Sequence, residues 1–167
     1  PALNIALSHG DVTDYSLLMM HQGATPNYDQ GLDAFKLEGN LMGVSLISED
    51  AMKLAHYVTN KFSEKDIPLH VMASEEGTFS LSFSSEFGAE NFSKFALVDK
   101  YMNKVYPITS IKPYVFEINQ NVSSRERRFY LSRNTDETTF MEPTVMLYPN
   151  PAADKINIEV AAEQDVD

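Results

Sequence analysis

Much of this chain repeats its apolar residues with a period of two, which is the pattern of half-buried β-strands. Residues 78–83 read TFSLSF, so every second side chain is apolar and lies on one face of an extended segment. Comparable runs recur roughly every 10–12 residues, separated by turn residues. They cover residues 3–7, 15–21, 42–47, 54–58, 67–73, 78–83, 95–98, 113–118, 128–132, 144–147 and 156–160. This spacing predicts an all-β fold, an antiparallel β-sandwich or jelly roll.

Helical signals are few. Ser48 is a good N-cap for a turn or two of helix over residues 49–55, and residues 90–92 suit a single turn. We therefore expect no more than short helical pieces between the strands.

Composition excludes several classes of protein. A length of 167 residues with 43% hydrophobic residues suits a folded domain with a substantial core. The chain has no cysteine, which removes disulfides and thiolate sites. A net charge of −11 opposes binding to nucleic acid or to anionic lipid. No apolar run approaches the ~20 residues of a membrane span.

The C-terminal segment predicts a strand, a rigid corner and a second strand. Pro149 and Pro151 fix φ and keep the residues before them extended, so no helix can begin there. Apolar and polar residues then alternate over residues 155–160. We place a β-sandwich module in residues 1–142, and a linker with the first strands of a second small β domain in residues 143–167.

This segment resembles the start of the C-terminal sorting domain that Bacteroidetes proteins use for type IX secretion. An apolar strand, the Tyr-Pro-Asn-Pro motif, an Asp and an alternating strand follow in the family's order. The resemblance assigns recognition of the sorting signal to Tyr148, Pro149, Asn150, Pro151, Asp154, Ile156 and Ile158. Because the family's sorting domain is several strands longer, we expect this chain to be part of a longer protein.

The preceding residues are similar to the β-rich module often found before that domain in large Bacteroidetes surface proteins. The matching pieces are residues 33–37 (DAFKL), 77–81 (GTFSL), 97–99 (LVD), 114–116 (YVF) and 128–129 (RF). The resemblance implies export through the periplasm to the extracellular space or the outer cell surface. It also implies an outer-membrane translocon, with its shuttle and sortase components, as partners that attach or release the protein.

No motif predicts catalysis. His9, His21, His56 and His70 lack the spacing of a zinc helix motif, and no G-x-S-x-G elbow is present. Neighbouring carboxylates such as Glu75 and Glu76 would diverge on a strand or face water on a turn. We expect no enzyme and no cofactor. Calcium is the metal that would suit such a module, with candidate ligands Asp11, Asp14, Asp29, Asp33, Asp136 and Glu137.

Two functions remain open. The first is a non-catalytic stalk or adhesin-type module, in which Arg128 of the basic run 125–128 pairs with a carboxylate or caps a sheet edge. The alternative is a β-sandwich module, attached to a secreted enzyme, that binds carbohydrate, including surface glycans, or another ligand. Its sugar-stacking candidates are Tyr101, Tyr106, Tyr114 and Tyr130.

Overall fold

The computed structural model describes residues 1–37, 39, 41–60, 65–87, 92–109, 111–133, 144–148 and 157–161. The chain divides into two units, residues 1–135 and residues 136–167. The boundary expected between residues 142 and 143 lies outside the described residues. No helix within the described ranges has the length and apolar character needed to cross a membrane.

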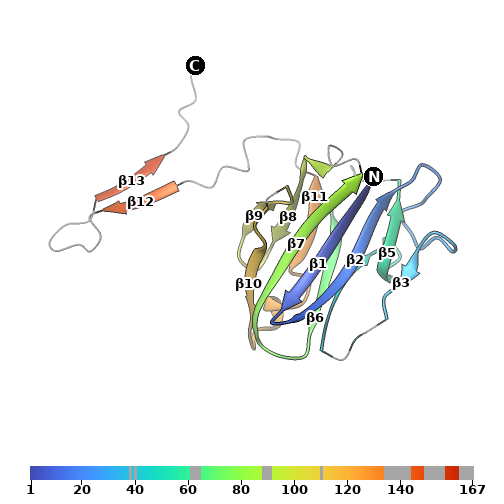
Figure 1. Cartoon of the computed structure of the whole chain (residues 1–167), viewed down its shortest axis with the longest axis horizontal. Helices are drawn as coiled ribbons and strands as arrows, with labels where there is room; N and C mark the ends of the chain where they lie inside the picture. Colours follow the sequence, from blue (N-terminus) through green and yellow to red (C-terminus); the bar gives the residue numbers. More distant parts are fainter. Residues whose placement is uncertain are drawn as a thin grey trace, which may run out of the picture. The chain divides into compact units, whose positions relative to one another are not determined.

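The first unit is built from one large, mostly antiparallel sheet (Figure 1). Its strands are β1 (Ala2–His9), β2 (Val12–Met20), β3 (Ala34–Phe35), β4 (Met42–Ile47), β5 (Lys53–Thr59), β6 (Ile67–Ala73), β7 (Gly77–Phe87), β8 (Phe95–Asp99), β9 (Lys104–Pro107), β10 (Tyr114–Ile118) and β11 (Phe129–Arg133). They follow the order β10-β7-β1-β2-β5-β4-β6-β11-β8-β9, and β3 pairs with β5. The predicted all-β fold is confirmed.

The sheet curls back on itself, so strands far apart in this order pack against each other. The rings of Phe116 on β10 and Phe129 on β11 lie 4.7 Å apart, and those of Tyr106 on β9 and Tyr114 on β10 lie 5.2 Å apart. In Figure 1, β7 crosses in front of β11. The two ends of the strand order therefore meet, and the apolar faces enclose one core.

Alternation along the strands places the core residues. In β6 every second side chain is buried, and the same alternation holds over residues 3–7 of β1 and 79–81 of β7, as the period of two predicts. The fully or almost fully buried apolar residues of these strands are Leu3, Ile5, Leu7, Ile67, Leu69, Val71, Phe79 and Leu81. Burial of these faces is the main stabilising contribution to such a fold.

Side chains join β2 to β4 where no strand lies between them. β5 pairs in parallel with the last residues of β2 and antiparallel with the end of β4. Beyond β5, Asp14 on β2 accepts a hydrogen bond from the Val44 amide at 2.7 Å, and the buried Ser16 hydroxyl donates to the Val44 carbonyl at 2.7 Å. The Lys36 ammonium lies 2.6 Å from the Asp14 carboxylate. These side chains replace the backbone hydrogen bonds that a neighbouring strand would make, so both the N–H and the carbonyl of Val44 have partners.

The helix expected over residues 49–55 is wrong. Ser48 does cap this segment, because its hydroxyl accepts the Met52 N–H at 3.0 Å, but the cap closes a tight turn only. Ala51 has a φ of 65°, which ends any helix, and β5 begins at Lys53. Pairing of β5 with three other strands outweighs the local helical signal. Of residues 90–92, the first two lie outside the described residues, and Phe92 is buried.

The second unit contains a two-stranded antiparallel sheet. β12 (Thr144–Tyr148) pairs with β13 (Asn157–Ala161), with Leu147 opposite Ile158 and Tyr148 opposite Asn157. The two predicted strands are therefore confirmed. The predicted corner, residues 149–156, lies outside the described residues.

Candidate functional site

The residues predicted to form the sorting signal fall partly on the hairpin of the second unit. Tyr148 ends β12, and Ile158 lies in β13, one register position from the partner of Tyr148. Pro149, Asn150, Pro151, Asp154 and Ile156 lie outside the described residues. The arrangement around the motif is thus two paired strands that begin and end close to it.

The carboxylates considered as calcium ligands hold turns and strands together. Asp29 accepts hydrogen bonds from the backbone N–H and the hydroxyl of Thr25, and Asp33 accepts from the N–H of Asp29 and of Val58. Asp14 serves the β2–β4 junction, and Asp11 lies in the turn after β1. In the described part of the chain, no three acidic or histidine side chains converge as a metal site would require. Asp136 and Glu137 lie outside that part.

The four histidines make separate contacts. The His9 ring stacks on Phe79 with centroids 4.3 Å apart, and its Nδ1 lies 2.8 Å from the Thr78 carbonyl oxygen. His21 Nδ1 accepts the N–H of Gly23, and His56 Nε2 lies 2.9 Å from the sulfur of Met19. His70 lies on β6, away from these contacts, and lines a groove described below. Each of the first three is explained by a local structural contact.

The four tyrosines considered for sugar stacking do not form an exposed aromatic face. Tyr114 is buried, which corrects its expected place on the surface, because the outward positions of β10 are those of Val115 and Glu117. The Tyr106 hydroxyl donates to the Lys112 carbonyl, and the Lys100 ammonium covers the Tyr130 ring at 3.7 Å from its centroid. The aromatic side chain with the greatest exposure among those described is Tyr15, on β2.

Arg128 forms the most deeply buried polar cluster among the described residues. Its Nη2 lies 2.7 Å from Asp99 Oδ2, its Nε lies 3.0 Å from both Asp99 oxygens, and both side chains are about 1% exposed. Its Nη1 donates to the carbonyls of Glu117 and Ser124. The predicted pairing of Arg128 with a carboxylate is confirmed. Asp99 itself was missed, although it closes the LVD run on β8.

Both carboxylate oxygens of Asp99 have hydrogen-bond partners besides Arg128. Its Oδ1 accepts the N–H of Tyr101 and of Met102, both at 3.0 Å, and its Oδ2 accepts the Tyr114 hydroxyl at 2.9 Å. Burial, then this hydrogen bond, raises the pKa of Tyr114 above its usual value. The cluster connects four elements: β10, β11, the 3₁₀ helix η2 (Val122–Ser124) and the turn that follows β8. Its location in the core and its full pairing identify it as a structural clamp.

Tyr57 gives a prediction for alkaline pH. Burial raises the pKa of Tyr57 to about 12, and its hydroxyl donates to the Pro26 carbonyl at 2.7 Å. Because the folded state favours the neutral phenol, this stabilisation is complete below the unfolded pKa of 10.0 and is lost as the pH rises toward 12. We expect the free energy of unfolding, measured by urea titration, to fall across that range and to fall less in Tyr57→Phe. Tyr15→Phe, which removes an exposed hydroxyl, should keep the wild-type slope; equal slopes in all three proteins would contradict the prediction.

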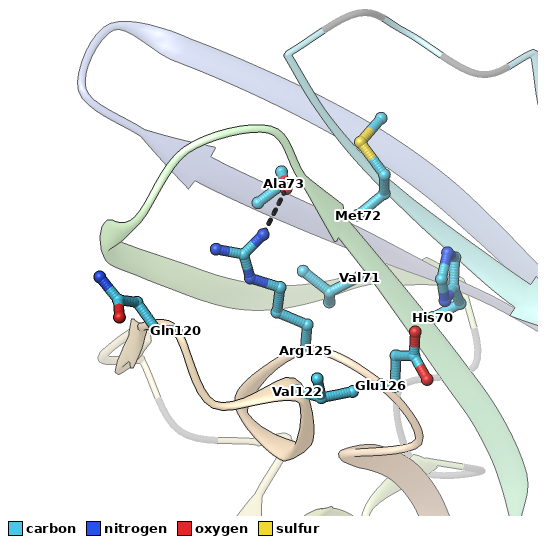
Figure 2. A pocket seen from close by; sticks show the side chains of 8 residues that line it. All are labelled: His70, Val71, Met72, Ala73, Gln120, Val122, Arg125 and Glu126. Atoms are coloured by element: carbon cyan, nitrogen blue, oxygen red, sulfur yellow. Dashed lines mark hydrogen bonds between the residues drawn. The ribbon is translucent and has the colours of Figure 1, made fainter.

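A groove lies between β6 and the segment that precedes β11. Figure 2 shows His70, Val71, Met72 and Ala73 along one wall and Arg125 reaching across toward the Ala73 carbonyl, at 3.5 Å. Gln120, Val122 and Glu126 complete the lining, and the groove encloses about 500 Å³. It combines backbone of a sheet strand with one cationic, one anionic and several apolar side chains. Such a lining suits binding of a ligand and has no nucleophile and base in contact.

The sequence carried only a partial signal for this groove. The basic run 125–128 was recognised, yet its members separate: Arg128 enters the core, whereas Arg125 lies in the groove. No protein-family model, no curated protein and no solved structure matches the chain.

Proposed function

We propose that this chain is a non-catalytic, extracellular β-module of a protein exported by type IX secretion, and that its C-terminal unit begins the sorting signal. The first unit would act as a stalk or adhesin-type segment that positions another part of the protein. The sorting unit would be recognised by the outer-membrane translocon through Tyr148, Pro149, Asn150, Pro151, Asp154, Ile156 and Ile158.

The observation that carries this proposal is the β12–β13 hairpin. The two strands on either side of the Tyr-Pro-Asn-Pro motif pair antiparallel, and they belong to a unit distinct from the large sheet. A separate hairpin is a suitable element for recognition by another protein, because a short strand pair offers unpaired edges. The first unit supports a structural role, because its described carboxylates and histidines mostly engage in turns, strand junctions and the Arg128 clamp.

An export assay tests the proposal. A secreted reporter is fused ahead of residues 136–167, extended through the rest of the sorting domain, and expressed in a type IX-competent bacterium. Alanine is then placed at Tyr148, Pro149, Asn150 and Pro151 together. We expect the reporter to remain in the periplasm, which is also the result expected for the parent fusion in a strain that lacks the translocon.

The matched control replaces Glu163 and Gln164 with Ala, which changes the same unit outside the motif. This control should be exported as the parent fusion is. Export of the motif variant at the parent level would overturn the proposal and leave the motif as a corner between two strands.

A further inference from the structure

Among the described residues, the strand ladder on one side of β6 stops at Leu69. One side of the strand pairs with β4 from Leu69 to Ala73, but the other side pairs with β11 only from Ile67 to Leu69. Continued in register, β11 would place Arg127 opposite Val71 and Arg125 opposite Ala73. The chain leaves the sheet instead: Arg127 has a φ of 50°, and η2 lies just upstream. The groove of Figure 2 occupies the place where β11 would have continued.

The pairing pattern shows which backbone groups point into this groove. In antiparallel sheets, alternate residues direct their N–H and C=O to opposite sides of the strand. Val44 on β4 directs both groups to Asp14 and Ser16 on β2, so its register partner Val71 on β6 directs its own groups away from β4. The Ala73 carbonyl points the same way, because it faces Arg125.

Arg125 adds a positive charge to this edge. Its Nη1 approaches the Ala73 carbonyl at 3.5 Å, a long contact that a better acceptor would replace. Across the described residues, Arg125 has no carboxylate within ion-pair distance, whereas Arg128 is fully engaged by Asp99. Glu126 also lines the groove, and Arg125 is the cationic side chain of that lining that an incoming carboxylate could engage.

We propose that the groove binds a short extended peptide that carries a carboxylate side chain. The peptide adds as a strand to β6, exchanging backbone hydrogen bonds with Val71 and Ala73. Its carboxylate pairs with Arg125, which releases the Ala73 carbonyl to the peptide backbone. Val122, 63% exposed at the rim, packs on the peptide's apolar side chains.

Amide NMR of the full 167-residue chain tests this proposal. In the free protein, the Val71 amide should exchange with solvent faster than the Met72 amide, which faces β4. The probe is a blocked peptide of alternating valine and glutamate, about six residues long, or ~20 Å when extended. Two N-methylated versions block the backbone N–H groups of one edge or of the other, and a third version replaces glutamate with lysine.

We expect the glutamate peptide to shift and protect the Val71 and Ala73 amides. One N-methylated version should lose binding and the other should retain it, because only one edge of the added strand faces β6. Arg125→Gln should remove the preference for glutamate over lysine while leaving the melting temperature unchanged. The Arg127→Gln control should keep the preference.

The proposal would be overturned if saturating peptide left both amides unchanged, or if both N-methylated versions bound equally. A preference for glutamate that survived Arg125→Gln would also overturn it. Protection of Val71 that rises with protein concentration in the absence of peptide would assign the edge to a second copy of the chain and contradict a peptide site.

Discussion

Replacing Asp99 with Asn should lower the free energy of unfolding by about 3–5 kcal/mol, the cost of leaving one buried charge without its partner. The substitution keeps the size of the side chain and an oxygen that can accept the Tyr101 and Met102 N–H groups. It removes the negative charge that faces Arg128, whose guanidinium is almost completely buried. Urea unfolding at neutral pH, followed by circular dichroism, measures the difference.

A matched control is available in Asp11→Asn, because Asp11 lies on an exposed turn. We expect that change to remain within about 0.5 kcal/mol. The double variant Asp99→Asn, Arg128→Met should lose less than the sum of the two single variants, since the second substitution removes the uncompensated charge. A loss below about 1 kcal/mol in Asp99→Asn would be typical of an exposed ion pair and would contradict the buried clamp.

Strands were predictable where one face is buried along most of their length. Apolar and polar residues alternate in β1, β6 and β7 because one face of each strand packs on the core, and this alternation is visible in the local sequence. β3 and β9 were missed. Both residues of β3 are exposed, and β9 has no fully buried position, so neither needs apolar alternation.

Pairing between distant strands was not predictable from local patterns. β5 pairs in parallel with β2 and also pairs with β3 and β4, and the local sequence of β5 does not indicate which strands become its neighbours. The same limit applies to the clamp: an Arg beside an apolar strand implies a carboxylate, but its partner lies 29 residues away among 24 acidic residues. The groove depends on the backbone turn at Arg127, a non-glycine residue with positive φ that no sequence rule indicates.

The closure of the sheet gives the second large effect. Phe116 projects inward from β10 and lies 4.7 Å from Phe129 of β11 and 6.0 Å from Phe79 of β7, between centroids. Its ring also lies 4.9 Å from the Arg128 guanidinium carbon, so it joins the clamp to the core. Phe116→Ala should therefore lower the free energy of unfolding by about 3–5 kcal/mol, through lost burial and the cavity left behind.

The neighbouring Val115 provides the control for this second prediction, because it is 62% exposed on the opposite face of β10. Val115→Ala should change stability by no more than about 0.5 kcal/mol. Equal effects of the two substitutions in urea unfolding would mean that β10 does not close the core. A large effect of Phe116→Ala alone would show that the Phe116 ring stabilises the core where β10 packs against β11, next to the Arg128 clamp.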